Sequence, residues 1–273
     1  MQVSQRNKQV IARIKEFVKK PLAQGLLWLA VLLVIWEIAS RCGLVASYIL
    51  PPFSKVVVTL ATELFKGQLL IMIGRSLLRL IISITLSLAI STVIILLCLR
   101  FRSFKNFYDL LSNIMNAVPS MAILPLIIMW FGIDITSIMI LVAHSVIWTF
   151  TIYVNEGIAS LSKVYRDFAD NIELSTARRV KEVYLPALLP NIVSGLKVVW
   201  ARAWRSLIGA EIVFGTIGRN GGLGYFINMN RLNGNMTKVL TGIIIIAAIG
   251  LLVEALIFRP ILKKLKKWGM TND

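Results

Sequence analysis

The ionisable side chains that could do chemistry in this sequence are few, and four of them, Lys197 included, interrupt the apolar stretch Leu188–Phe214. Arg202, Arg205 and Glu211 lie in that stretch, where ionisable residues are costly and are often functional. Arg202 and Arg205 are three residues apart and therefore share one face of a helix, about 21–26 Å from its start at Leu188. Two cations on one face could line a path for an anion. Alternatively, they could extend to the lipid headgroups, or pair with Glu211 or Glu37.

Side chains suited to enzymatic or metal chemistry are scarce. The sequence has one histidine, His144, and two cysteines, Cys42 and Cys98, with no C-x-x-C motif. A zinc site or a catalytic Cys–His pair has almost no residues to draw on, and no G-x-S-x-G or H-E-x-x-H motif occurs. We therefore expect neither a metal nor a catalytic site, and an intramembrane enzyme is the least favoured class. We interpret His144 as a hydrogen-bonded structural residue rather than a proton relay.

Composition indicates a membrane protein. Of the 273 residues, 57% are hydrophobic and 16% are charged, against about 45–50% and about 25% in ordinary soluble domains. These values exclude a disordered chain and make a soluble enzyme a poor fit. The net charge of +17 could indicate nucleic-acid binding, but the cations cluster between apolar runs, which is typical of membrane proteins. We therefore expect lipid, and no nucleic acid, as a partner.

Six apolar segments could cross a bilayer, which needs about 20 such residues each. They must be helices, because backbone groups in lipid have to bond within their own segment. The expected fold is an all-α, polytopic membrane protein with a transmembrane domain over residues 21–258. The expected spans are 21–40, 76–99, 110–133, 135–155, 187–214 and 239–258.

Basic residues give this domain an expected orientation. They concentrate in an amphipathic segment at 1–20, near residue 100, in a long polar loop at 156–186 and in a tail at 259–273. Because basic loops stay on the cytoplasmic side, we expect both termini there. The first segment lacks a cleavage site, so we expect an uncleaved first span preceded by a basic helix on the inner leaflet.

Two prolines, Pro119 and Pro125, fall in the third expected span. Prolines persist in membrane helices where neighbouring groups or water satisfy the freed carbonyls. A kink beside a solute path would expose Ser120 and Met121 to that path. A kink that serves packing alone explains the prolines equally well.

The loop at 156–186 carries a motif with defined spacing. It runs Asp167-Phe168-Ala169, three residues, Glu173, nine residues and Val183-Tyr184-Leu185-Pro186. This segment resembles, in all its spacings, the cytoplasmic signature of ABC-importer permeases: E-A-A, three residues, Gly, nine residues and I-x-L-P. Phe168 and Glu173 depart from the family residues. The family glycine separates two short helices, so at Glu173 the element either turns by other means or continues as a helix.

Further segments resemble the permeases of nitrate, sulfonate, taurine and bicarbonate importers, in the same order along the chain. They are Ile49-Leu50-Pro51-Pro52, Arg75-Ser76-Leu77-Leu78-Arg79, residues 118–126 with Trp130-Phe131-Gly132, Ala210-Glu211 and Gly222-Leu223-Gly224. The resemblance implies a type I ABC importer permease fold. For Glu211, in the family's Ala-Glu pair, we expect a structural or gating role rather than contact with solute.

The resemblance also implies a function. Such a permease forms the pathway for a small solute, here expected to be anionic, which an external binding protein delivers. The implied partners are a second permease copy, as a homodimer, and two ATPase subunits that bind ATP and Mg²⁺. This sequence has no Walker A motif, so no cofactor is expected in this chain. The implied location is a bacterial or archaeal inner membrane.

The implied site residues form two groups. The coupling element that the ATPase would grip comprises Asp167, Phe168, Ala169, Glu173, Val183, Leu185 and Pro186, with Pro186 suited to the first turn of the fifth span. The candidate pathway residues are Pro119, Ser120, Met121, Arg202, Arg205 and Glu211. An ion-coupled secondary carrier is an alternative, but such carriers typically show two similar halves, and no such repeat is evident.

Overall fold

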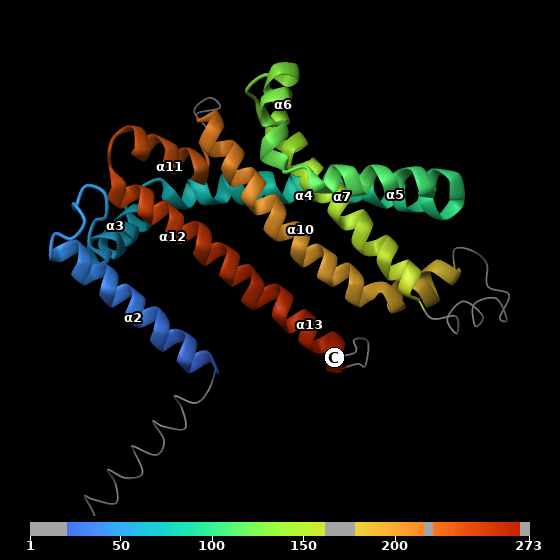
Figure 1. Ribbon diagram of the computed structural model, residues 1–273, viewed down its shortest axis with the longest axis horizontal. Helices are drawn as coiled ribbons and strands as arrows, with labels where there is room; N and C mark the ends of the chain where they lie inside the picture. The colour runs from blue at the N-terminus through green and yellow to red at the C-terminus, as the bar shows by residue number, and fades with distance from the viewer. Residues whose placement is uncertain (1–20, 162–177, 216–220, 268–273) are drawn as a thin grey trace, which may run out of the picture. The chain divides into compact units, whose positions relative to one another are not determined.

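The computed structural model describes residues 21–161, 178–215 and 221–267, and this part of the chain is helical and contains no strand (Figure 1). The all-α prediction is therefore confirmed. The elements are α2 (Pro21–Arg41), α3 (Phe53–Phe65), α4 (Leu69–Arg100), α5 (Arg102–Ala117), the 3-10 helix η1 (Ser120–Ile123), α6 (Leu124–Phe131), α7 (Ile135–Ser160), the π-helical η2 (Arg179–Tyr184), α10 (Leu185–Phe214), α11 (Leu223–Leu232), α12 (Met236–Val253), the π-helical η3 (Glu254–Phe258) and α13 (Arg259–Lys267).

Five helical runs in the described residues are long and apolar enough to cross a membrane, and a bent pair makes a sixth candidate. That pair falls on the third expected span, 110–133. It consists of Arg102–Ala117 followed by Ser120–Phe131, and the two parts meet at 88°. The second candidate, Leu69–Arg100, begins earlier than the sequence indicates. The chain is therefore a polytopic helical membrane protein in which the third expected span is sharply bent between Ala117 and Ser120.

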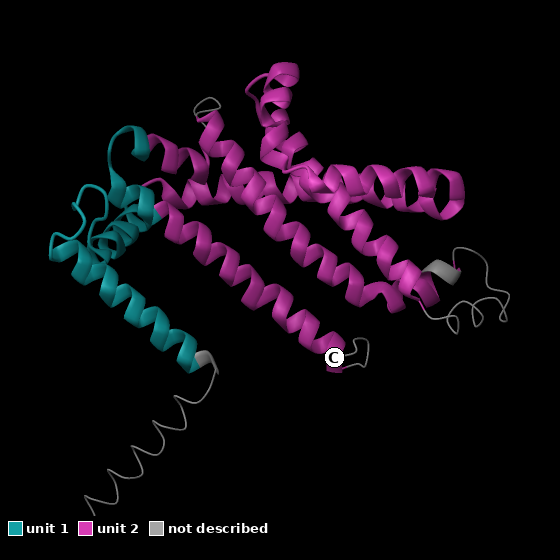
Figure 2. Cartoon of the chain, in the orientation of Figure 1, with its two compact units in different colours: residues 1–66, 230–241 teal, residues 67–229, 242–273 magenta. Residues whose placement is uncertain are grey.

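The chain divides into two compact units (Figure 2). The first comprises residues 1–66 and 230–241. Within it, Trp36 Nε1 donates to the carbonyl of Pro51 at 3.0 Å. Glu37 accepts hydrogen bonds from Arg41 Nε at 2.6 Å and from the backbone and hydroxyl of Ser54. Lys238 Nζ lies 2.7 Å from Glu63 Oε1. Polar contacts thus join the elements of this unit. The Glu37 carboxylate takes part in them through Arg41 and Ser54.

The second unit, residues 67–229 and 242–273, is built around α7, which packs against both α10 and α4. Small residues allow this close packing, as is usual between membrane helices. A Cβ added to Gly157 would lie 2.9 Å from Asn191 Cβ, and one added to Gly195 would lie 3.0 Å from Tyr153 Cβ. Substitution at either glycine would therefore push α7 and α10 apart.

Buried hydroxyls line the same helices without breaking them. On α4, Ser83, Ser87 and Ser91 recur every fourth residue, and each hydroxyl donates to the carbonyl four residues earlier at 2.6–2.8 Å. On α7, Thr151 does the same to Ile147 at 2.8 Å. Each hydroxyl is thus satisfied within its own helix, so a buried polar face costs little.

The start of α7 is fixed by a side-chain cap. Asp134 Oδ2 accepts a hydrogen bond from Thr136 N at 3.4 Å and from Thr136 Oγ1 at 3.0 Å. Hydrogen bonds from the backbone of Ile135 and from the hydroxyl and backbone of Thr136 lower the pKa of Asp134 below its ordinary value of 3.8. Gly132, with φ of 73°, ends α6 just before the cap. A left-handed residue and a cap together reverse the chain between α6 and α7.

Candidate functional site

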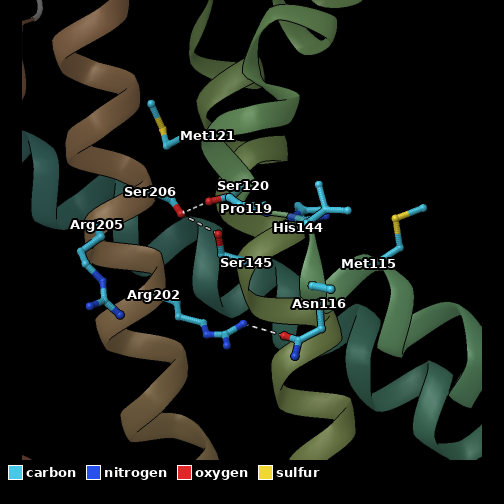
Figure 3. A pocket seen from close by; sticks show the side chains of 12 residues that line it. Met115, Asn116, Pro119, Ser120, Met121, His144, Ser145, Arg202, Arg205 and Ser206 are labelled. Atoms are coloured by element: carbon cyan, nitrogen blue, oxygen red, sulfur yellow. Dashed lines mark hydrogen bonds between the residues drawn. The ribbon is translucent and has the colours of Figure 1, made fainter.

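A cavity of about 380 Å³ lies beside the break in the third span, within the second unit (Figure 3). It is lined by residues 115–121, His144, Ser145, Arg202, Arg205 and Ser206. The lining therefore comes from the end of α5, the break itself, α7 and α10. Ser145 is ten residues after the start of α7 and fifteen before its end, which places the cavity about 15 Å from one end of the helix and about 22 Å from the other.

The break itself is caused by Pro119. Val118 before it is extended, with φ of −78° and ψ of 118°, because a residue that precedes proline is pushed out of the helical region. Pro119 carries no N–H, and its carbonyl accepts from Ala122 N at 2.9 Å to start η1. The predicted kink is therefore present, and it borders a cavity, which is where irregular backbone is tolerated at membrane depth. Pro125 has a different role, because it lies in the first turn of α6.

Three serines connect the helices at the cavity wall. The hydroxyl of Ser206 on α10 lies 2.7 Å from that of Ser120 and 2.6 Å from that of Ser145 on α7 (Figure 3). Ser120 is among the residues that the sequence predicted for the pathway, whereas Ser145 and Ser206 are not. Ser206 follows Arg202 by four residues and so shares its helical face, which is the signal that could have found it.

The two arginines that the sequence singled out both line this cavity. Arg202 Nη1 donates to Asn116 Oδ1 at 2.5 Å and to Thr149 Oγ1 at 3.0 Å, so neutral partners hold its side chain. Arg205 is exposed. Among the described residues, no carboxylate pairs with either arginine. Glu211 pairs with Arg79 instead, so the alternative of pairing with Glu211 is wrong, and both arginines line the cavity without a carboxylate partner in the described part of the second unit.

His144 also lines the cavity, but not as the sequence analysis expected. Both ring nitrogens are buried and, within the described ranges, have no hydrogen-bond partner. The ring packs edge-on against Trp148, with centroids 6.3 Å apart. Among the described residues, no protein group supplies the predicted hydrogen bond, and packing against Trp148 is the structural contact of this ring. A sequence cannot reveal this, because it shows the helix on which a histidine lies but not which groups face it.

Met121 lies at the upper edge of the cavity in Figure 3. A Cβ added to Gly209 on α10 would lie 2.9 Å from Met121 Sδ. The thioether thus packs onto the backbone of α10, at a point where only glycine leaves room. Met121 both lines the cavity and fixes the distance between the break and α10.

Glu211 does not line the cavity, and its candidacy as a pathway residue is not supported by its position. The residue as a whole is 2% exposed. Oε1 accepts from Arg79 Nη1 at 2.9 Å, and Oε2 accepts from Ser76 Oγ at 2.7 Å and from Gly224 N at 3.0 Å. Ser76 Oγ in turn accepts from Leu223 N at 2.8 Å. The carboxylate therefore ties together α4, α10 and the start of α11.

The close packing around Glu211 explains why glycine occupies positions 222 and 224. A Cβ at Gly222 would lie 2.2 Å from Glu211 Oε1, and a Cβ at Gly224 would lie 2.6 Å from the carbonyl oxygen of Ile208. Three of the motifs that carry the family resemblance, at 75–79, 210–211 and 222–224, thus meet at one buried carboxylate. The sequence placed them in order but could not show that they touch.

The coupling element is only partly described. Asp167, Phe168, Ala169 and Glu173 lie outside the described residues. Val183 is buried in η2 and Leu185 is exposed. Pro186 lies in the first turn of α10, although η2 precedes that helix without a gap. Pro186 therefore marks a change of helical pitch rather than a helix that starts from a loop.

Comparisons with known proteins agree with this architecture. The family model for the binding-protein-dependent transport system inner membrane component matches residues 91–259, more than half of the chain. A putative aliphatic sulfonates transport permease of Bacillus subtilis is 30% identical over 90% of this chain and 87% of its own length. The taurine transport system permease of Escherichia coli is 27% identical over 88% and 87%. A nitrate import permease of Leptolyngbya laminosa is 28% identical over 55% and 52%.

The family match, the similarity over nearly the whole length of these relatives and the polytopic helical fold lead to one assignment. The chain belongs to the binding-protein-dependent inner membrane components, which are the permease subunits of ABC importers.

Proposed function

We propose that this permease forms the translocation pathway for a small anionic solute, and that the solute passes the cavity between the broken span, α7 and α10. The observation that carries the proposal is the pair Arg202 and Arg205, which line the cavity without a carboxylate partner among the described residues. Unpaired cations away from water raise the local concentration of anions and exclude other cations. The relatives named for sulfonates and nitrate support the same solute class.

The two arginines have different tasks in this proposal. Arg202 is held by Asn116 and Thr149 and supplies a fixed positive field. Arg205 is the group free to bind, because its planar guanidinium can donate two parallel hydrogen bonds to the oxygens of one anion. Hydroxyls of the serine cluster offer further donors to an oxygen-rich solute. No step requires a bond to be made or broken.

The energy source is proposed to lie in partner subunits. An external binding protein delivers the solute, two ATPase subunits bind ATP and Mg²⁺, and a second copy of this chain completes the pathway as a homodimer. Asp167, Phe168, Ala169 and Glu173 contact the ATPase, while Val183, Leu185 and Pro186 pass its motion to α10. Both termini and the loop at 156–186 face the cytoplasm, in keeping with their basic residues.

Charge-removing and charge-retaining variants of Arg205 test the solute class. In proteoliposomes that contain the complete importer, uptake of ethanesulfonate, taurine and nitrate is measured for the wild type, Arg205→Gln and Arg205→Lys. For the transported anion we expect Arg205→Gln to lower kcat/KM at least about tenfold, because a charged hydrogen bond contributes about 1.5–3 kcal/mol. Arg205→Lys should recover part of the loss.

Arg259→Gln is the matched control, since Arg259 lies on α13 and does not line the cavity. It should transport like the wild type. If Arg205→Gln also matches the wild type for every anion that the importer carries, the cavity is not the anion site.

A further inference from the structure

A second cavity, of about 400 Å³, lies where α4 ends and α5 begins, against the last turns of α7. It is lined by residues 98–100, Arg102, Lys105, Asn155, Ile158 and Ala159. Its volume is within the range of about 300–1,000 Å³ that small-molecule sites occupy. Three of its lining residues are basic and none is acidic. The cavity therefore favours an anion, and it lies at the opposite end of α5 from the arginine pair.

Two of these three cations are available for a ligand. Lys105 is already bound to Asp109, one turn further along α5. Arg100 and Arg102 are exposed, and within the described part of the chain neither has a carboxylate partner. The guanidinium of Arg100 lies 5.2 Å from the ring centroid of Phe101, which holds it near the cavity without neutralising its charge.

The start of α5 adds a second, independent attraction for an anion. Its cap residue, Phe101, provides no side-chain hydrogen bond, and the first turn contains no acidic residue. The first amide groups of a helix have no partner inside the helix and carry partial positive charge. In this 16-residue helix, those amides belong to the turn that contributes Arg102 to the cavity. Phosphate groups commonly bind at such a helix end.

The rim of the cavity is apolar. Leu99, which lines it, is 47% exposed, and the neighbouring Leu96 and Phe101 are 53% and 51% exposed. In a membrane protein, side chains of this kind face acyl chains. A phospholipid has its phosphate next to its acyl chains. The cations of the cavity could therefore bind the phosphate while the apolar rim contacts the chains. A free phosphate ion would use the cations but gain nothing from the rim.

We propose that this cavity binds the phosphate group of an anionic phospholipid from the cytoplasmic leaflet, with Arg100, Arg102 and the first amides of α5 as its donors. The leaflet follows from the orientation proposed above, which places the basic α4–α5 connection on the cytoplasmic side. The bound lipid would brace the junction at which the broken third span begins. This site is separate from the solute pathway and does not depend on the identity of the solute.

Lipid retention by the purified full-length chain tests the site. The chain is incorporated into nanodiscs of phosphatidylcholine with increasing phosphatidylglycerol, and bound lipid is counted by native mass spectrometry after release. The double variant Arg100→Gln, Arg102→Gln should bind phosphatidylglycerol about 30-fold more weakly than the wild type, because each basic residue near a membrane surface contributes a factor of about five. Arg100→Lys, Arg102→Lys should retain most of the binding and shows that the fold tolerates change there.

The double variant Lys263→Gln, Lys267→Gln removes the same charge from α13, outside the cavity; it should weaken the general attraction to the anionic surface but keep the lipid that the cavity retains. Inorganic phosphate at millimolar concentration is the second arm. Displacement of phosphatidylglycerol by phosphate alone would make this a free-phosphate site and overturn the lipid proposal. Unchanged lipid binding in Arg100→Gln, Arg102→Gln would overturn it too. None of these experiments measures uptake. A failure of the lipid proposal can therefore be told from a failure of the proposed solute pathway.

Discussion

At the scale of single residues, the charged groups of the second unit divide into paired and unpaired sets. Glu211 and Arg79 form a buried pair, with side chains 1% and 11% exposed. Arg202 and Arg205 face a cavity with no such partner among the described residues. A buried, paired charge has a structural role, whereas an ionisable residue without a charged partner in a membrane span is a candidate for ligand binding. Position along the sequence alone does not separate the two sets, since all but Arg79 lie on α10.

Truncation of Glu211 should be among the most destabilising changes in the chain. Glu211→Ala removes the carboxylate from the buried Arg79 and takes the acceptor from the Gly224 amide and the Ser76 hydroxyl; breaking a buried pair in this way costs about 3–5 kcal/mol. Thermal unfolding of the detergent-purified protein should therefore show a large fall in Tm. Glu254→Ala is the control, because the Lys197–Glu254 pair is 40% and 28% exposed and should contribute about 1 kcal/mol or less. Similar losses in the two variants would contradict the structural role of Glu211.

At the scale of elements, the sequence predicted most helices but not their roles in the cavity. Proline before a helical turn predicted the break at Pro119, since proline removes a hydrogen bond. The start of α5 at Arg102 was not predicted, because Asn106, Asp109 and Ser112 lower the hydropathy of its first turns. Ser145 and Ser206 were missed because serines in apolar helices usually bond their own backbone. The roles of these serines depend on contacts between helices that are far apart in the sequence.

The cap of α7 should make its start sensitive to acid. The pKa of Asp134 is lowered in the folded protein, first by the backbone of Ile135 and then by Thr136. A carboxylate with a lowered folded pKa contributes stability above its unfolded pKa, and this contribution is lost as the pH falls through the folded pKa. Thermal unfolding followed by circular dichroism should show this loss below about pH 4.

Asp134→Asn keeps an acceptor at the cap but cannot titrate. The difference in Tm between this variant and the wild type should therefore shrink as the pH falls below the ordinary value of 3.8. A difference that stays constant with pH would show that the ionised cap does not stabilise the α6–α7 reversal.

At the scale of the whole molecule, the proposed function couples the cavity in this chain to ATPase subunits outside it. Ala169, in the proposed coupling element, should connect the two. Ala169→Glu places a bulky charge at the proposed ATPase contact. In a reconstituted importer we expect ATP hydrolysis to continue while solute uptake falls at least about tenfold. Ala169→Ser is the small-residue control and should couple normally. Normal uptake by Ala169→Glu in an assembled complex would remove Ala169 from the contact.

The serine cluster at Ser206 has a mechanical consequence for the cavity wall. Either oxygen can be the donor in each of its two contacts, with Ser120 and with Ser145. A rotating hydroxyl proton, or one entering water molecule, can replace a lost partner without leaving a charge behind. Partners can therefore be exchanged where these three serines meet without leaving a buried charge unpaired. The Glu211 carboxylate, which joins α4, α10 and α11, can only accept hydrogen bonds. Its contacts therefore cannot be exchanged in the same way.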